Sequence, residues 1–320
     1  MTLSPDAPHA TLPSTVSAII VSYNTGAVLA DALQALRTQI GLNEIILIDN
    51  GNPAGAVESA VERAIAASAP SEIDTGPSIR VLSGHGNIGF AAACNKGAAA
   101  VRADQGDAYL LFINPDALAP EGLVAALKAD AAALSRPSLI APKLVNPSGL
   151  EQQGSRRARL TPWRAIVEAT KLYRIAPGHA WLSRFNRHEE PCPSTLTQLD
   201  VISGACFFLA KADYDAVGGM DEGYFLHVED VDFCERFAAA GGSIWFDPAI
   251  AVVHHKSSSA VSPLKVEWWK TKSLSRYFRK HFADQSPPGS LFLLNAGLFS
   301  AFAARAAATA LRRGSTRPST

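Results

Sequence analysis

Short apolar runs alternate with amphipathic segments along the first part of the chain. Val16–Val21 is almost wholly apolar, and Leu29, Leu33 and Leu36 follow it at helical spacing. This pattern predicts a strand buried on both faces, followed by a helix that packs on the sheet. Further strands are expected at 44–48, 79–82 and 109–113, and further helices at 57–67 and 90–101. The first ~125 residues should therefore form an α/β domain with a parallel, Rossmann-like sheet flanked by helices.

The second part of the chain is less regular. Residues 136–197 are rich in Pro, Arg and aromatic residues and show weak periodicity, so we expect an irregular insertion there. A strand is expected at 200–209, then a helix that begins with the acidic residues 229–232, then strands at 243–246 and 251–253. The predicted domains are a flexible tail at 1–14, an α/β domain at 15–262 that contains the insertion, and a helical tail at 263–320.

Composition and charge favour a folded globular protein and argue against a general nucleic-acid-binding protein. Hydrophobic residues make up 48% and charged residues 18% of the chain, as in a folded globular protein. The formal net charge is zero, which argues against a general nucleic-acid-binding protein. The charge is unevenly spread, however, because residues 263–320 hold ten Lys and Arg but only two acidic residues. This basic tail indicates a partner of its own.

The cysteines and the first residues predict the cellular compartment. The four cysteines lie far apart and form no CxxC pair, which favours reduced thiols over a disulfide or zinc framework. Residues 1–14 lack the basic and apolar regions of a signal peptide. We therefore expect a cytoplasmic protein.

One glycine-rich motif suggests a dinucleotide. Gly84–Gly89 has the form GxGxxG and lies between a predicted strand and a predicted helix, with Asp107 or Asp116 following it. Such a loop fits a dinucleotide-dependent oxidoreductase. The motif follows two strand–helix units, whereas the dinucleotide fingerprint usually opens its domain.

Acidic residues and a histidine lie at several predicted strand ends and turns. Asp49, Asp116, the acidic segment 229–232 and His254 could meet in one crevice, because ligands bind beyond the carboxyl ends of such sheets. Each has an ordinary structural explanation as a helix cap or turn residue. Together they could hold a hard divalent cation and supply a carboxylate base.

The order of these motifs resembles family 2 glycosyltransferases, in the branch of bacterial rhamnosyltransferase-like enzymes of cell-surface polysaccharide assembly. The matching segments are Ser22–Asn24, Asp49-Asn50, Gly86–Phe90, Asn95–Gly97, Asn114–Asp116, Gly204–Phe208, Gly218–Glu222, Glu229–Cys234, Arg236 and His254. The resemblance implies a GT-A fold and inverting transfer of a sugar from a nucleotide diphosphate to an acceptor hydroxyl. The implied donor is dTDP-L-rhamnose, and the implied acceptor is a glycan or a lipid-linked saccharide. A catalytically silent sugar-nucleotide-binding module is the other alternative to this enzyme.

The resemblance also implies roles for particular residues. Those expected along the nucleotide are Tyr23, Asn24, Asp49, Asn50, Asn87, Gly89, Asn95 and Asn114. Tyr23, Asp49 and Asn50 would hold the base, and Gly89 would let the diphosphate approach the backbone.

The implied metal site and catalytic base use other residues. Asp116 would be the metal-binding acid of the family's DxD element, with Mg²⁺ or Mn²⁺ as the ion. The first acid of that element is replaced by Asn114, which weakens the expected metal affinity. His254 would be a second ligand, with His255 left open as its equivalent. Asp230 is the expected general base and Glu229 the alternative.

The tail and the insertion carry aromatic and basic residues together. Lys265, Lys270 and Lys272 flank Trp268-Trp269, and 291–304 is uncharged and apolar. These features predict a helix lying in the plane of an anionic membrane surface rather than spanning it, so the enzyme would be peripheral on the inner face of the cell membrane. The alternatives are packing on the catalytic domain and a homodimer interface. In the insertion, Trp163, Trp181 and the pair Arg156-Arg157 suggest an acceptor lid or a contact with a diphosphate lipid.

Overall fold

The computed structural model describes residues 15–68, 76–102, 108–255 and 261–314, so the expected flexible tail at 1–14 lies outside the described residues. A central sheet has the strand order β3-β2-β1-β4-β10-β6-β11-β5, with β8 paired to β11, and β7 pairs with β9 in a small second sheet. The strands are β1 Thr15–Ser22, β2 Glu44–Asp49, β3 Ser78–Leu82, β4 Ala108–Ile113, β5 Ala117–Leu118, β6 Ser138–Val145, β7 Arg156–Arg157, β8 Thr197–Gln198, β9 Val201–Ile202, β10 Cys206–Ala210 and β11 Ser243–His254. The predicted α/β class and mostly parallel sheet are confirmed.

The helices are α1 Val28–Arg37, α2 Ala56–Ser68, α3 Phe90–Ala100, α4 Leu123–Ala133, α5 Pro162–Thr170, α6 Lys211–Ala216, α7 Glu229–Ala239, α8 Pro263–Phe282 and α9 Ser290–Gly314, with 3₁₀ turns η1 Leu172–Arg174 and η2 Ala180–Leu182. Successive residues of β1 face opposite sides of the sheet, so Ile19 joins a core with α3 and α7 while Ile20 joins one with α1, α2 and α4. Burial on both faces explains the continuous apolar run of this strand.

Strand β10 is the longest of three strands that depart from a purely parallel sheet, since the short strands β5 and β8 also pair antiparallel with β11. It pairs antiparallel with β4 on one side and with β6 on the other. Every residue of β10 is buried, and the Phe207 and Phe112 rings stack with centroids 4.5 Å apart. Phe207 and Phe208 therefore pack in the core and do not line an acceptor site.

The irregular insertion is shorter than the expected range 136–197. Residues 138–145 form β6, a buried strand that runs parallel to β11 in the central sheet. Pro142 interrupts the apolar pattern of this strand, which hides it from periodicity. The two strands expected at 243–246 and 251–253 are one strand, β11, with an irregularity between Asp247 and Ala251.

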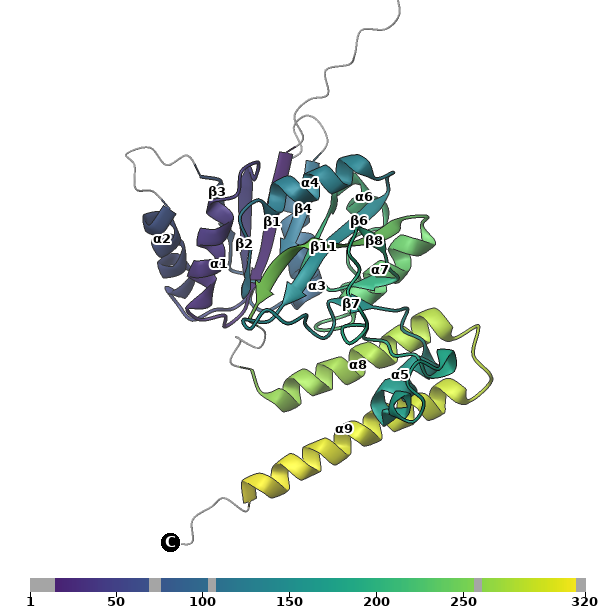
Figure 1. Ribbon diagram of the computed structural model, residues 1–320. Helices are drawn as coiled ribbons and strands as arrows, with labels where there is room; N and C mark the ends of the chain where they lie inside the picture. The colour runs from purple at the N-terminus through teal and green to yellow at the C-terminus, as the bar shows by residue number, and fades with distance from the viewer. Residues whose placement is uncertain (1–14, 69–75, 103–107, 256–260, 315–320) are drawn as a thin grey trace, which may run out of the picture.

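The C-terminal helices lie on the side of the molecule toward which the parallel strands run (Figure 1). Helix α8 is tied to the catalytic domain by ion pairs with Asp232 of α7, which is fully buried. Lys280 Nζ lies 2.8 Å and His281 Nε2 2.7 Å from Asp232 Oδ1, while Arg236 Nε lies 2.7 Å from Oδ2. Burial acts to raise the pKa of Asp232, but these three partners hold it well below its ordinary value. Packing on the catalytic domain is thus the observed state of α8.

Helix α9 packs along α8 but leaves its other side open. Among the described residues, one helical stretch, Ser290–Ala310, is long and apolar enough to cross a membrane, with a mean hydropathy of 1.5 and none of it buried.

Replacing the buried acid tests the attachment of α8. Asp232→Asn should lower the free energy of unfolding by about 3 kcal/mol, because it leaves buried or half-buried cations without their carboxylate. Urea unfolding measures this change. Asp213→Asn is the matched control, because Asp213 pairs with the half-exposed Arg136 and should cost about 1 kcal/mol or less. Equal losses from the two variants would contradict a structural role for the Asp232 cluster.

Candidate active site

Polar residues gather where β1 and β2 end. Strand β1 ends at Ser22 and the adjacent β2 ends at Asp49, and the Asn50 amide donates to the Ser22 carbonyl oxygen at 2.8 Å. Tyr23 and Asn24 follow β1 and are half-buried, and Asn24 has a left-handed backbone with φ 48°. Their assignment to the nucleotide base stays a prediction.

One carboxylate oxygen of Asp49 is hydrogen-bonded to the turn that follows β2. Its Oδ1 accepts from the amides of Gly51 and Asn52 at 3.1 and 2.9 Å and from Asn52 Nδ2 at 2.8 Å. Partial burial acts to raise the pKa of Asp49, but the hydrogen bonds from Asn52 and Gly51 and the nearby His85 outweigh it and lower the pKa. Asp49 therefore presents an ionised acceptor at the strand edge. Both ring nitrogens of His85 are enclosed and have no hydrogen bond within the described residues.

The glycine-rich loop is fixed by Asn50. Asn50 Oδ1 accepts from the Ile88 amide at 3.0 Å, and its Nδ2 donates to Asn87 Oδ1 at 3.1 Å. The loop thus begins α3 directly beside the end of β2. Gly89 has φ 88°, and a Cβ there would lie 2.8 Å from the Phe225 carbonyl oxygen. Gly89 therefore permits a close approach to the backbone of Phe225, and its expected role beside a diphosphate stays a prediction.

Asn95 has a different role from the one expected along the nucleotide. Its Nδ2 donates to the Met220 carbonyl and to Glu222 Oε1, both at 2.9 Å, and its Oδ1 accepts from Tyr214 Oη and the Met220 amide. All of its hydrogen-bonding capacity is therefore used within the protein. Asn95 fixes the turn before α7 and does not lie free along a nucleotide.

The structure brings Asp116 and His254 together. His254 Nε2 lies 3.1 Å from Asp116 Oδ1 and 3.3 Å from Asn114 Nδ2. His255 is exposed, and its amide donates to the Asp116 carbonyl. Of the two histidines left open by the sequence, His254 is the one whose ring meets Asp116.

Gln152 sets the orientation of this histidine. Its Nε2 donates to the His254 carbonyl oxygen, so its Oε1 faces His254 Nδ1 at 2.9 Å and accepts a hydrogen bond from the proton on Nδ1. That tautomer leaves a lone pair on Nε2, directed toward the Asp116 carboxylate. A cation between Nε2 and the carboxylate, which is either a proton or a metal ion, satisfies both groups at this separation of 3.1 Å.

The pair fits a divalent ion. Adjacent ligands of an octahedral ion with bonds of ~2.1 Å lie ~3.0 Å apart, close to the observed separation. No group of three or more His, Cys, Asp or Glu that could hold a metal occurs in the described part of the chain. Mg²⁺ and Mn²⁺ commonly complete such small protein sites with water and substrate phosphates. The donor set therefore suits a metal that binds together with a diphosphate.

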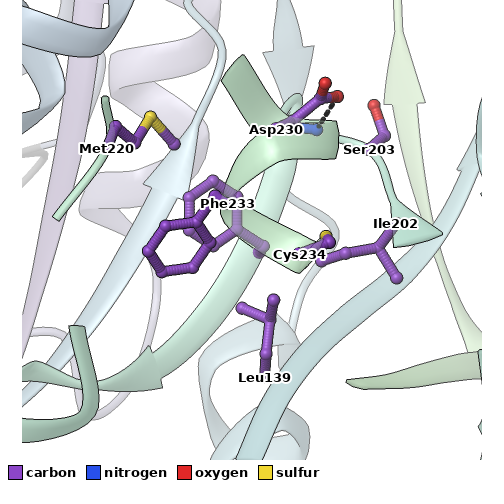
Figure 2. Close-up of a pocket in the computed structure, with 9 residues that line it drawn as sticks. Leu139, Ile202, Ser203, Met220, Asp230, Phe233 and Cys234 are labelled. Carbon is purple, nitrogen blue, oxygen red and sulfur yellow. Dashed lines mark hydrogen bonds between the residues drawn. The ribbon is translucent and has the colours of Figure 1, made fainter. Parts of the chain in front are cut away.

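Asp230 is held in place from two sides. Its Oδ2 accepts from Arg157 Nη2 at 2.5 Å and from the Gly204 amide at 2.9 Å. Its Oδ1 accepts from the Val231 amide at 2.8 Å. Figure 2 shows this carboxylate on the side of Ser203, away from the apolar side chains of Leu139 and Phe233, which line the same cavity. Burial acts to raise the pKa of Asp230, but the Arg157 charge and these hydrogen bonds lower it.

Glu229 has the opposite environment. It is 7% exposed, and its Oε2 has no partner within the described residues. Burial and the neighbouring Asp230 charge raise the pKa of Glu229 to about 8. These surroundings favour the ionised form of Asp230 and the protonated form of Glu229, so Asp230 is the better placed of the two to accept a proton.

The backbone before this pair is strained. His227 and Val228 have φ values of 65° and 70°, which is unusual for non-glycine residues and especially for a β-branched one. This left-handed turn begins α7 and directs Glu229 and Asp230.

Residues 203–205 connect the two parts of the site. The Asn114 amide donates to the Ala205 carbonyl at 2.8 Å, and the neighbouring Gly204 donates to Asp230. This segment therefore contacts Asp230 directly and reaches the Asp116–His254 pair only through Asn114, whose Nδ2 lies 3.3 Å from His254 Nε2.

The sequence did not predict the contact of Gln152 with His254, the position of His85 near Asp49, or the ion pair of Arg157 with Asp230. The Arg156-Arg157 pair was noticeable as two adjacent cations in the insertion, but its partner lies on a distant helix. No pattern distinguishes Gln152 from Gln153, or His85 from other loop histidines.

Comparison with known proteins identifies the class. Residues 17–180 match the model of glycosyl transferase family 2, which is more than half of the chain. The chain therefore belongs to glycosyl transferase family 2, and it is a glycosyltransferase. This finding overturns the oxidoreductase interpretation of Gly84–Gly89 and replaces that of a silent binding module.

The curated relatives are rhamnosyltransferases. The N-acetylglucosaminyl-diphospho-decaprenol L-rhamnosyltransferase of Mycobacterium tuberculosis is 28% identical over 222 residues, which cover 67% of this chain and 67% of that protein. Rhamnosyltransferase WbbL of Escherichia coli is 33% identical over 87 residues, 26% of this chain and 32% of that protein. The predicted rhamnosyltransferase-like branch is thereby confirmed.

Solved structures show the same GT-A fold. Mannosyltransferase PcManGT from Pyrobaculum calidifontis, in complex with GDP-Man and Mn²⁺, has a TM-score of 0.51 at 17% identity and covers 97% of this chain and 83% of that one. GalNAc-T7 with UDP, GalNAc and Mn²⁺ has a TM-score of 0.54 at 17% identity. The match covers 90% of this chain, which spans about half (54%) of GalNAc-T7.

The raised pKa of Glu229 makes stability depend on pH. The unfolded chain loses this proton near pH 4.5 and the folded chain near 8, so the folded protein loses stability as the pH rises between these values. The Gln side chain of the variant Glu229→Gln does not titrate, so this variant lacks that loss of stability. Between about pH 5 and 8, the melting temperature of the variant should fall by roughly 4 °C less than the melting temperature of the wild type. Differential scanning calorimetry at the two pH values measures this, with the exposed Glu58→Gln as control. Parallel melting curves for wild type and Glu229→Gln would show that Glu229 is not protonated in the fold.

Proposed function

We propose that this glycosyltransferase is an inverting, metal-dependent enzyme that transfers L-rhamnose from dTDP-L-rhamnose to a hydroxyl of a lipid-linked or cell-surface glycan. The rhamnosyltransferase names of its curated relatives, one of which includes a diphospho-decaprenol, support the donor sugar and a lipid-linked acceptor. The observation that supports the proposal is the chain of hydrogen bonds that runs from Asp230 through Gly204 and Ala205 to Asn114, which lies beside the Asp116–His254 pair.

The donor would lie along the carboxyl edge of the sheet. Asp49 and Tyr23 would contact the base, and Asn114 and Asp116 would lie near the diphosphate. Asn50 would act by holding Asn87 in the loop beside them. A divalent cation bound by Asp116 and His254 would stabilise the negative charge that develops on the leaving diphosphate.

Asp230 would accept the acceptor proton. The acceptor hydroxyl oxygen forms a bond to the anomeric carbon, the bond from that carbon to the diphosphate breaks, and the nucleoside diphosphate leaves with the electron pair. The hydroxyl proton passes to Asp230. Because Arg157 and Gly204 occupy Oδ2, the oxygen that receives it is Oδ1.

The enzyme would work at the cytoplasmic face of the cell membrane. The α8–α9 hairpin lies on the side of the molecule toward which the parallel strands run (Figure 1). The stretch Ser290–Ala310 of α9 is apolar, and none of it is buried. An anionic membrane surface would cover this side. A homodimer would bury the same side and is the competing arrangement.

A thermal-shift panel with Mn²⁺ tests the donor. dTDP-L-rhamnose should raise the melting temperature more than UDP-glucose or GDP-mannose, because only a ligand that binds the folded state stabilises it. EDTA should remove most of this increase. A larger shift with another nucleotide sugar would overturn the rhamnose assignment.

Transfer assays decide between the two candidate bases. Asp230→Asn should lower kcat by about a thousandfold and leave the donor-induced thermal shift intact, because the change removes the proton acceptor and not a donor contact. Glu229→Gln should lower kcat by less than about tenfold, since Glu229 is protonated at neutral pH. The reverse order of the two effects would transfer the base assignment to Glu229.

Metal binding tests the orientation of His254. Gln152→Leu should weaken Mn²⁺ binding in the presence of dTDP by about ten- to a hundredfold, because His254 loses the partner that fixes its tautomer. Isothermal titration calorimetry measures the affinity. The exposed neighbour variant Gln153→Leu is the control and should bind Mn²⁺ as the wild type does. Unchanged affinity in Gln152→Leu would remove His254 from the metal site.

A further inference from the structure

The outer side of α9 is an exposed apolar surface. Phe292 is 76% and Leu293 is 70% exposed, and no charged residue occurs between 285 and 304. A helix that faces water normally places polar residues on that side. This side of α9 therefore lacks the composition of a solvent-facing surface.

Helix α9 is nevertheless held in place along α8. The Trp268 ring on α8 lies 5.9 and 5.3 Å from the Phe299 and Phe302 rings, and Arg305 forms an ion pair with Glu267. Helix α8 is in turn tied to Asp232. A membrane-spanning α9 would lose these contacts, because lipid would surround the helix. The packing favours α9 lying in the membrane plane, with one side on α8 and the other on lipid.

The insertion provides a second exposed apolar surface. Ile175 is 77% and Trp181 is 76% exposed, and Trp163 and Ile166 are exposed as well. Trp163 Nε1 donates to the Trp181 carbonyl oxygen at 2.5 Å, so the two tryptophans belong to one folded unit.

This unit begins beside the α8–α9 hairpin. The Leu160 carbonyl oxygen accepts from Tyr277 Oη of α8 at 3.1 Å, and the Arg159 guanidinium lies 5.5 Å from the Phe282 ring at the end of α8. Two residues after Leu160, α5 begins. Figure 1 draws α5 at the end of the hairpin where the chain passes from α8 to α9.

Exposed apolar side chains concentrate in these two segments. The large ones exposed among the described residues are Ile40, Ile65, Val81, Leu150, Trp163, Ile166, Ile175, Trp181, Trp268, Phe292, Leu293 and Phe299. Eight of these twelve belong to the segment 163–181 or to α8 and α9. Scattered exposure is ordinary, whereas concentration on adjacent elements marks an interaction surface.

Positive charge accompanies this surface. Lys265, Lys270 and Lys272 on α8 and Lys171 and Arg174 in the insertion are exposed. Lys272 Nζ lies 4.9 Å from the Trp269 ring centroid, which pairs a cation with an aromatic ring. Tryptophan and lysine side by side are typical of the interface between anionic headgroups and acyl chains.

We propose that the insertion segment 163–181 and the outer side of α9 together form one surface that lies on an anionic lipid bilayer. This bipartite membrane surface extends the proposed function, because it gives the insertion a role and directs the carboxyl edge of the sheet toward the bilayer from which a lipid-linked acceptor would come. The insertion segment would contact the bilayer at the end of the α8–α9 hairpin nearest α5, and α9 would contact it along the remaining length of the hairpin.

Vesicle flotation with paired variants of the full chain tests this surface. The vesicles contain equal parts of phosphatidylglycerol and phosphatidylcholine. Ile175→Ser with Trp181→Ser, and separately Phe292→Ser with Leu293→Ser, should each lower the partition coefficient about tenfold, because each removes two exposed apolar side chains that the bilayer would cover. Ile40→Ser is the matched control, because Ile40 is 86% exposed but lies before the amino end of β2, opposite to the carboxyl ends of the strands. The partition coefficient of this variant should equal that of the wild type.

Three results would overturn the proposal. The insertion pair could float like the wild type, binding to pure phosphatidylcholine could be equally strong, or light scattering could show a dimer that the Phe292 and Leu293 changes dissociate. Circular dichroism and melting curves that match the wild type confirm that the variants fold. Transfer to a water-soluble, short-chain acceptor should be unchanged in both pairs. If wild-type protein transfers no rhamnose but the partition losses occur, the proposed function fails while the membrane surface stands.

Discussion

The short segment 203–205 is the constraint on which the active site depends. It leads into β10, which enters the sheet antiparallel between β4 and β6. Because β10 pairs with β4, Ala205 lies beside Asn114 at the end of that strand. The same segment offers the Gly204 amide to Asp230. Moving β10 by one register would break the hydrogen bonds that link Asp230, through Gly204 and Ala205, to Asn114 at the end of β4.

Two adjacent carboxyl groups at the start of α7 have pKa values shifted in opposite directions, because their surroundings differ. Asp230 faces a guanidinium and backbone amides, whereas Glu229 is buried with an oxygen that has no partner in the described part of the chain. The charge on Asp230 further disfavours a charge on Glu229. The insertion contributes to this difference, since Arg157 comes from β7 and pairs with a helix that is distant in sequence. The segment that sequence patterns describe least well therefore provides the main electrostatic partner of the proposed base.

The C-terminal helices differ in their environment although they follow one another in the chain. The basic residues of α8 divide between ion pairs to the catalytic domain, as for Lys280, and exposed positions, as for Lys270. Among the described residues, the ring contacts and the ion pair of α9 are formed with α8. Since Asp232 holds α8 and Asp230 lies two residues away on α7, the hairpin and the proposed base share one rigid support.

The sequence by itself determined the class of fold, the branch of the family and most of the polar edge. Apolar runs and helical spacing depend on neighbouring residues, so Val16–Val21 and Leu29–Leu36 identify their elements without tertiary information. Only the tertiary structure decided the direction of β10, the placement of β6 in the sheet, the commitment of Asn95 to a turn, and the roles of Gln152 and Arg157. Gln152 meets His254 across 102 residues of chain and Arg157 meets Asp230 across 73. The partner of a polar side chain is set by how distant elements pack, and no local pattern carries that information.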